Sequence, residues 1–163
     1  MSSLTDMSET GDGTTGWIYT GDAANGVAAG SDYTLAAGVA GGLEVQCNKP
    51  GAANPLVGWY TAPTGGIVDD YHMLAYEFSG SWVVWSPGGT DIVTNPRTYE
   101  AGDHIRIRFN STNDVTVEIA RAGAPTTWLL LAFATITRSV TLYPKLGSLS
   151  TDGAVLSAPK VSV

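Results

Sequence analysis

The sequence is poor in charged side chains. Asp, Glu, Lys and Arg make up 14% of the 163 residues, against roughly 25% in an average soluble domain. The polar surface must therefore come mainly from Ser, Thr, Asn and Gly, which suit strand surfaces and turns better than helix surfaces. The net charge is -7, and the densest basic pair is Arg106 with Arg108. Because an acidic surface repels phosphate backbones, we expect no nucleic-acid partner.

The sequence also lacks paired cysteines and long apolar runs. Cys47 is the single cysteine, which excludes an intramolecular disulfide. It lies in an expected strand with no local signature of a catalytic thiol, which predicts a buried, unreactive cysteine. The longest apolar run, residues 128–134, is far shorter than the ~20 residues of a membrane helix. It fits a buried strand, and we expect no membrane insertion. Residues 1–16 show neither the basic nor the apolar region of a secretory signal, so we expect no export by that route.

Turn-forming residues, by contrast, are abundant. The chain has 20 glycines and 8 prolines, and Gly, Pro, Asn and Asp clusters interrupt short apolar runs before any helical period develops. We expect strands over residues 16–19, 33–37, 42–47, 56–61, 71–78, 81–86, 104–110, 115–120, 128–135, 140–147, 154–157 and 160–163. Strands at this spacing predict a single all-β domain over residues 17–163, built as a sandwich or barrel.

The first part of the chain differs from the rest. Residues 1–16 are polar and glycine-rich and carry no core-forming pattern. We predict an extended N-terminal arm there, outside the core. Two alternatives stay open for it, a disordered start and an arm that orders against a neighbouring subunit.

Strict alternation of apolar and polar residues marks two segments, 104–109 and 115–119. A short polar loop joins them, which predicts a β-hairpin. Matching the two apolar faces sets the register and places Arg106 opposite Glu118. We expect a structural cross-strand ion pair there, worth under about 1 kcal/mol.

Several tryptophans come in positions that reach both faces of a sheet. Trp82 and Trp85 are three residues apart on one expected strand, so their side chains point to opposite faces. Trp59 and Tyr60 have the same property as direct neighbours. One member of each pair is expected at the surface, where an aromatic ring stacks on a sugar or a neighbouring subunit. The alternative for each tryptophan is core packing.

Two tyrosines add to the same surface. Tyr71 and Tyr76 have opposite parity on one expected strand, which predicts that one of them joins the exposed aromatic residues. The ligand-binding candidates are Trp59, Tyr71, Trp82 and Trp85.

Catalytic patterns are missing from the sequence. It has no Gly-x-Ser-x-Gly turn and no Gly-x-x-x-x-Gly-Lys-Ser/Thr phosphate loop. A glycosidase needs two carboxylates at a set separation, and the sequence does not show whether any two of Glu44, Glu77 and Glu118 meet. We expect no catalytic residue and no enzyme activity, and glycoside hydrolysis stays a third hypothesis.

The sequence has one acidic cluster that includes a histidine. Asp69 and Asp70 precede His72, but strand alternation separates the two aspartates, and two ligands are too few for zinc. Calcium takes six to eight oxygen ligands, to which Asp152 is a further candidate. We expect no cofactor, with calcium at Asp69, Asp70 and Asp152 as the open alternative.

Two segments carry a family resemblance. Residues 99–107, Tyr-Glu-Ala-Gly-Asp-His-Ile-Arg-Ile, resemble the turn that delivers a strand in concanavalin-like and jelly-roll sandwiches. Residues 142–149, Leu-Tyr-Pro-Lys-Leu-Gly-Ser-Leu, with the glycine turn at 151–154, resemble the C-terminal part of lectin-like domains in phage fibres and particle-surface proteins. The resemblance implies an antiparallel jelly-roll sandwich that contacts carbohydrate or a receptor at its loops or on one concave sheet.

Three functions follow from these observations. The first is a non-enzymatic structural protein of a phage-like virion, a head decoration or a tail or fibre component. It would be assembled in the host cytoplasm, contact other virion proteins, and form a homo-oligomer such as a trimer. The second is a carbohydrate-binding module or receptor-binding lectin for a cell-surface glycan. The third is a glycoside hydrolase.

Overall fold

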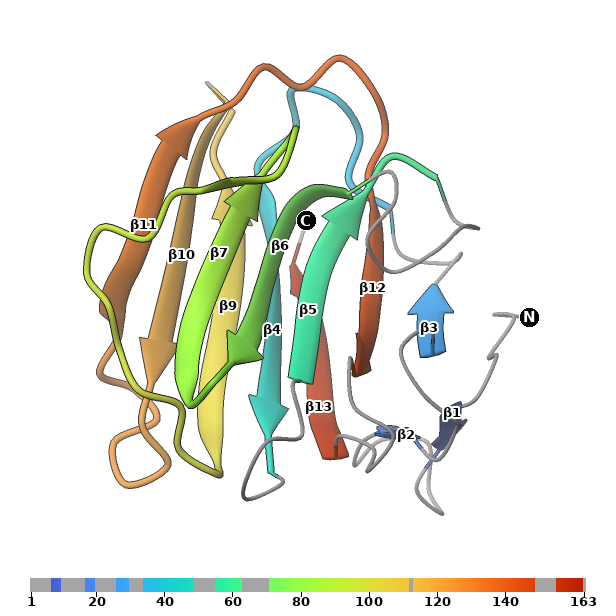
Figure 1. Cartoon of the computed structure of the whole chain (residues 1–163). Coiled ribbons are helices and arrows are strands. Elements are labelled where there is room, and N and C mark those ends of the chain that lie inside the picture. Colours follow the sequence, from blue (N-terminus) through green and yellow to red (C-terminus); the bar gives the residue numbers. More distant parts are fainter. Residues whose placement is uncertain are drawn as a thin grey trace.

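The chain folds as two antiparallel β-sheets that face each other (Figure 1). The computed structural model describes residues 34–48, 55–62, 71–111 and 113–148 and the backbone of four further strands. The larger sheet has the order β1 (Met7–Glu9), β2 (Trp17–Tyr19), β13 (Val155–Ser162), β4 (Gly41–Cys47), β9 (Asp103–Phe109), β10 (Asp114–Ala120) and β11 (Leu129–Thr135). The smaller sheet has the order β3 (Gly26–Ala29), β12 (Tyr143–Ser148), β5 (Pro55–Tyr60), β6 (Tyr71–Phe78), β7 (Ser81–Ser86) and β8 (Thr90–Asp91). The predicted all-β antiparallel sandwich is confirmed.

Most predicted strands are present, with small changes at their ends. β6 and β7 have the predicted bounds, and β12 begins at Tyr143 instead of residue 140. The strand predicted at 33–37 is wrong in its described part, because Leu35 makes only an isolated bridge to Leu142. The two strands predicted near the C-terminus form one strand, β13, whose register shifts between Ser157 and Lys160. Pro159 lies at that shift, and it has no N–H for the ladder.

Part of the predicted N-terminal arm forms a strand. Met7–Glu9 pairs with Trp17–Tyr19 at the edge of the larger sheet, so three residues of that arm lie in a β-ladder. The other residues from 1 to 16 lie outside the described part of the chain, and the arm and the boundary at residue 17 stay predictions. Among the described residues, no helix has the length and apolar character that crossing a membrane requires.

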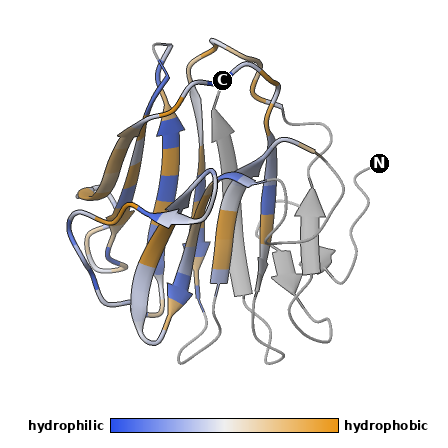
Figure 2. Cartoon of the chain, turned by 45° about the horizontal axis from the view of Figure 1, so that its top comes forward, coloured by the Kyte–Doolittle hydropathy of each residue, from blue (hydrophilic) through white to orange (hydrophobic). Residues whose placement is uncertain are grey.

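The core lies between the sheets and follows strand alternation. Hydrophilic and hydrophobic residues alternate in bands along the strands (Figure 2), as expected for a sheet with one face buried. The inward side chains of β9 and β10 are those predicted from the alternation: Ile105, Ile107, Phe109, Val115, Val117 and Ile119. On β4 the inward side chains are Leu43, Val45 and Cys47. The predicted hairpin register is confirmed, because Arg106 pairs with Glu118.

A buried carboxylate fixes the start of β9. Asp103 is fully buried and accepts hydrogen bonds from Arg121 Nη1 at 2.8 Å and from the Glu100 N–H at 3.0 Å. It also accepts a hydrogen bond from the Trp82 indole at 3.2 Å. Gly102, at φ +92°, makes the tight turn that delivers Asp103 to this position. Burying a charge in this way is tolerated only when it is paired and hydrogen-bonded.

Candidate functional site

Two of the four predicted ligand-binding aromatics are inside the core. Trp59 and Trp82 are 0% and 2% exposed and belong to the cluster between the sheets. The Trp59 indole donates to the carbonyl of Ile107 at 3.5 Å, while the Trp82 indole donates to Asp103. Since both rings are enclosed and their N–H groups are used, neither is accessible for stacking on a sugar. Both take the alternative role, core packing.

The other two predicted aromatics lie on the outer face of the smaller sheet. Trp85 is half-buried there, opposite in direction to Trp82, as the parity argument predicts. The prediction that Tyr71 and Tyr76 face opposite ways is wrong. Their ring centroids lie 6.2 and 5.1 Å from that of Trp85, because a bulge in the pairing with β5 resets the alternation along β6.

The outer face of the smaller sheet is mostly closed. Leu56, Tyr60 and Leu74 are fully buried there, so Tyr60 is not the exposed partner of Trp59 that its position suggested. Lys145 is also fully buried, with its Nζ 4.4 Å from the centroid of the Tyr60 ring. Burial raises the pKa of the Tyr60 phenol, with a smaller contribution from Tyr71. This face is a packing surface with a half-open edge at Tyr71 and Trp85.

The remaining candidates concern a metal site and the single thiol. Asp69, Asp70 and Asp152 lie outside the described residues. Within the described ranges, no three His, Cys, Asp or Glu side chains gather closely enough to hold a metal ion. Cys47 is fully buried, and burial, with the charge of Asp103, raises the pKa of its thiol. The prediction of a buried cysteine is confirmed.

The outer face of the larger sheet is mainly polar over the strands β4, β9, β10 and β11, whose side chains the structure describes. Strand pairing sets its side chains in rows, because residues opposite one another in a ladder point to the same side. The first row runs across β4, β9, β10 and β11 and consists of Gly42, Arg108, Thr116 and Phe133. The second row consists of Glu44, Arg106, Glu118 and Leu130.

An ion-pair network orders the centre of this face. Arg106 Nε and Arg108 Nη2 donate to the same Glu118 oxygen at 2.8 and 2.9 Å. Burial alone would raise the pKa of Glu118, but the hydrogen bonds and charges of the two arginines outweigh it and lower that pKa. The guanidinium carbon of Arg106 lies 3.8 Å from the centroid of the Trp128 ring, a cation–π contact. Glu118 is therefore held ionised as the anchor of both arginines.

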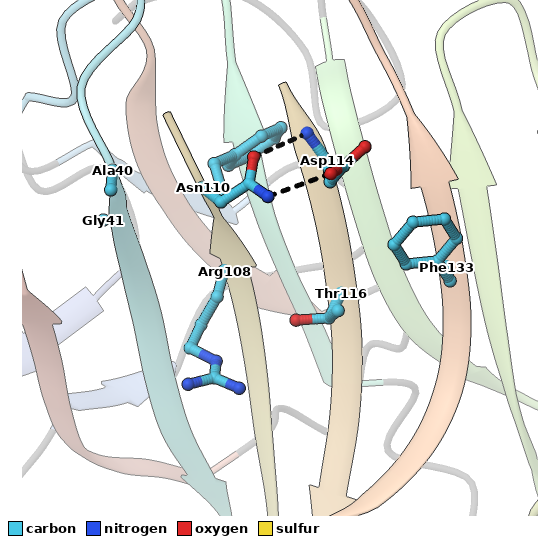
Figure 3. Close-up of a pocket in the computed structure, with 8 residues that line it drawn as sticks. Ala40, Gly41, Arg108, Asn110, Asp114, Thr116 and Phe133 are labelled. Atoms are coloured by element: carbon cyan, nitrogen blue, oxygen red, sulfur yellow. Dashed lines mark hydrogen bonds between the residues drawn. The ribbon is translucent and has the colours of Figure 1, made fainter. Parts of the chain in front are cut away.

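A hollow of about 500 Å³ lies at one end of this face (Figure 3). We call it the Arg108–Phe133 groove, and its lining residues are Ala40, Gly41, Arg108, Phe109, Asn110, Asp114, Thr116 and Phe133. Phe133 is 51% exposed, and the Arg108 side chain is 50% exposed. The groove thus combines an open aromatic ring with a guanidinium that solvent can reach.

Hydrogen bonds hold the acidic end of the groove in place. Asn110 Nδ2 donates to Asp114 Oδ2 at 2.9 Å, and the Asp114 N–H donates to Asn110 Oδ1 at 2.9 Å (Figure 3). The Thr135 hydroxyl donates to Asp114 Oδ1 at 2.6 Å. Asn113, at φ 68°, makes the left-handed turn of the loop between β9 and β10. An oriented carboxylate and amide are acceptors and donors suited to ligand hydroxyls.

A glycine makes room for the arginine of the groove. A Cβ at Gly42 would lie 2.8 Å from Arg108 Cγ and 3.1 Å from the Ile107 carbonyl oxygen, so glycine leaves the space that the stem of Arg108 occupies. The outward direction of Arg108 follows from the alternation of residues 104–109. The exposure of Phe133 was missed, because a run such as 128–134 is typical of a strand buried on both faces.

A bulge explains why Phe133 reaches the surface. Val117 pairs with Ala132 but Glu118 pairs with Leu130, so Leu131 is the additional residue on β11. Leu131 and Ala132 are both buried, while Leu130 and Phe133 are exposed on the same outer face. No pattern within an all-apolar run marks the position of such a bulge.

No family model matches the chain, and no curated protein matches it. Solved structures do match. The SPRY domain of human HERC1 has a TM-score of 0.64 at 12% identity, with 99% of this chain and 97% of that chain covered. The exoplasmic domain of VIP36, bound to Ca²⁺ and Man3GlcNAc, has 0.66 at 9% identity, with coverage of 96% and 80%. The legume lectin-like domain from Entamoeba histolytica has 0.62 at 12% identity, with coverage of 95% and 85%.

These likenesses establish the fold class. Identities of this size show shared architecture alone. The chain is a lectin-like β-sandwich of the concanavalin-like kind, as the two sequence segments at 99–107 and 142–154 suggested.

Proposed function

We propose that this chain is a non-enzymatic carbohydrate-binding domain whose sugar site is the Arg108–Phe133 groove. One observation carries the proposal: the half-exposed ring of Phe133 lines the same hollow as Arg108, Asn110 and Asp114. An apolar ring face beside a few oriented polar groups is the composition of a site for a small polar ligand. Carbohydrates match it, because one sugar presents both C–H faces and hydroxyl groups.

The solved structures support this reading. VIP36 is described as bound to Man3GlcNAc, and Emp46p is described as a carbohydrate recognition domain. Emp46p has a TM-score of 0.59 at 6% identity. Their binding properties come to this chain only as part of the proposal. Calcium at Asp69, Asp70 and Asp152 belongs to the proposal in the same way, and binding assays with and without EDTA test it.

Hydrolysis is the weaker alternative for this fold. Glu77 is buried at 1% exposure, where its Oε1 accepts from the Gly80 N–H at 2.5 Å. Glu118 is held ionised by two arginines, so it has no proton to give to a leaving group. Neither Glu77 on β6 nor Glu118 on β10 is therefore well suited to acid catalysis.

A phage-like virion is the setting that we propose for this domain. The support is the resemblance of residues 142–154 to the C-terminal part of lectin-like domains in phage fibres and particle-surface proteins. In that setting the chain contacts other virion proteins as a homo-oligomer, and the groove binds a host-surface glycan. Immunogold labelling of purified particles from the source culture tests this. Unlabelled particles, with the protein recovered elsewhere, would remove the virion role and leave sugar binding untouched.

The experiment for sugar binding compares the two sheet faces. A glycan array is screened with the wild-type protein, Phe133→Ala and Trp85→Ala. We expect a wild-type hit that Phe133→Ala weakens at least tenfold, about 1.4 kcal/mol, and that Trp85→Ala leaves unchanged. Far-UV circular dichroism of both variants controls for folding.

The opposite pattern has a clear meaning. Binding lost in Trp85→Ala and kept in Phe133→Ala would move the site to Tyr71 and Trp85 on the smaller sheet. Hydrolysis of any bound glycan, followed by chromatography of the products, would overturn the non-enzymatic part.

A further inference from the structure

The charges on the outer face of the larger sheet are unevenly paired. Arg106 and Arg108 both bind Glu118, through the same oxygen. Arg106 is also covered by the Trp128 ring, and its side chain is 18% exposed. Arg108 is 50% exposed, and no aromatic ring of the described residues covers it. The part of the positive charge that Glu118 does not neutralise is therefore presented to solvent by Arg108.

The guanidinium of Arg108 has donors to spare. It carries five N–H donors in a planar fork that matches a carboxylate. Among the described residues, Glu118 is its one partner, and that contact uses Nη2. The other nitrogens can donate to a ligand. Charge-assisted pairs of this kind are stronger than hydrogen bonds between neutral groups.

The two ends of the groove have opposite charge. Arg108 is opposite Thr116 in the ladder, and Asp114 is two residues before Thr116 on the same strand. Two residues along a strand span about 7 Å, which is comparable to one sugar ring with its substituents. Asp114 is held by Asn110 and Thr135 and repels a ligand carboxylate. A ligand carboxylate therefore belongs at the Arg108 end, with hydroxyl groups at the Asp114 end.

We propose that the Arg108–Phe133 groove binds a carboxylated sugar, a uronic acid, with its carboxylate on Arg108, its ring on Phe133 and its hydroxyls at Asp114 and Asn110. This inference rests on the proposed function and names its ligand class. Its physical basis is that Arg108 is the exposed guanidinium within the groove, while the acidic side chain of the groove, Asp114, is at the other end.

The test uses ligand pairs in which a methyl ester removes the charge of the carboxylate. Oligomers of galacturonate, glucuronate and mannuronate are compared with their methyl esters, which keep the ring and hydroxyls but lose the negative charge. Titration calorimetry measures affinity at one fixed salt concentration, because charge contacts weaken with salt. We expect wild-type protein to bind at least one acid at least tenfold more tightly than its ester.

Three variants assign the effect to the arginine. Arg108→Gln is expected to abolish the preference for the acid and to keep ester binding. Arg108→Lys is expected to retain part of the preference, because it keeps the charge but not the fork. The control Arg97→Gln removes an exposed arginine outside the groove and is expected to change nothing.

Each result separates the two proposals. Binding of neutral glycans that depends on Phe133, without preference for acids, would overturn the uronate assignment and leave sugar binding in place. A preference for acids that survives Arg108→Gln would also overturn the assignment. Absence of binding to both the acids and the array glycans by folded protein would overturn both proposals.

Discussion

The outer faces of the two sheets differ in what covers them. On the smaller sheet, Leu56, Tyr60, Leu74 and Lys145 are fully buried, and Tyr71 and Trp85 are half-buried. On the larger sheet, the corresponding positions carry arginine, glutamate and threonine, and Phe133 is exposed. Apart from Phe78, which is exposed at the end of β6, the aromatic face is thus a packing face, and the polar face is the more accessible one.

Because of this difference, an aromatic residue in this fold does not by itself indicate a sugar-binding site. Trp and Tyr are the residues usually expected to stack on sugars, and four of them were the predicted site. Three described tryptophans of this chain, Trp59, Trp82 and Trp85, serve the two hydrophobic clusters instead. On the larger sheet the accessible ring is Phe133, next to an arginine whose position is set by strand alternation. On the smaller sheet, Phe78 at the end of β6 is also exposed.

The largest expected difference between the two faces is in stability. Leu74→Ala, on the outer face of the smaller sheet, is expected to cost about 2–5 kcal/mol, because Leu74 is fully buried. Thr116→Ala, on the outer face of the larger sheet, is expected to stay within about 0.5 kcal/mol. Urea unfolding at pH 7 measures both. Equal costs would mean that the smaller sheet is not covered as described.

A second substitution sharpens the comparison within the smaller sheet. Trp85→Ala is expected to cost about 2 kcal/mol, less than a fully buried tryptophan, because the ring is half-buried against Tyr71 and Tyr76. Trp85→Phe should recover about half of that loss. Thermal unfolding gives both values, and an unchanged midpoint in Trp85→Ala would show that the aromatic contacts contribute little.

Sequence alone predicts the fold best where a strand buries one face, because apolar and polar residues then alternate. Segments 104–109 and 115–119 alternate strictly, so matching their apolar sides gave the register and the Arg106–Glu118 pair. Short edge strands lack this signal. β8 is two residues long and exposed, and its Thr-Asp sequence resembles a turn.

Only part of the candidate site could be predicted from the sequence, because the alternation pattern is lost at a bulge. Arg108 follows from alternation, but Phe133 depends on the extra residue at Leu131. A bulge changes the parity of every later residue on its strand. In an all-apolar segment, both parities satisfy the hydrophobic pattern, so only the packed structure decides between them. The same effect on β6 reversed the prediction for Tyr71 and Tyr76.

The polar face also has a stability contribution that depends on pH. The pKa of Glu118 is lower in the folded chain than in the unfolded chain, so the unfolded chain binds the proton more readily in acid. The contribution is complete above the ordinary pKa of about 4.5 and is lost as the pH falls through the folded value. Glu118→Gln is expected to cost up to about 1 kcal/mol at pH 7, given solvent screening, and much less at pH 3. Thermal unfolding at the two pH values measures this, and a cost independent of pH would contradict it.

The smallest expected effect on stability is at His72, which is buried between the two sheets. The centroid of its ring lies 5.9 Å from that of Phe109. Burial, with a smaller contribution from the charge of Arg138, lowers the pKa of His72. The unfolded chain therefore protonates first, and stability is full above the ordinary pKa of about 6.5 and declines as the pH falls toward the folded value. His72→Gln should remove this decline, a fraction of a kcal/mol, whereas His104→Gln on the open outer face should keep it. Urea midpoints at pH 7.5 and 5.5 test the pair, and a decline that persists in His72→Gln and disappears in His104→Gln would assign it to the polar face instead.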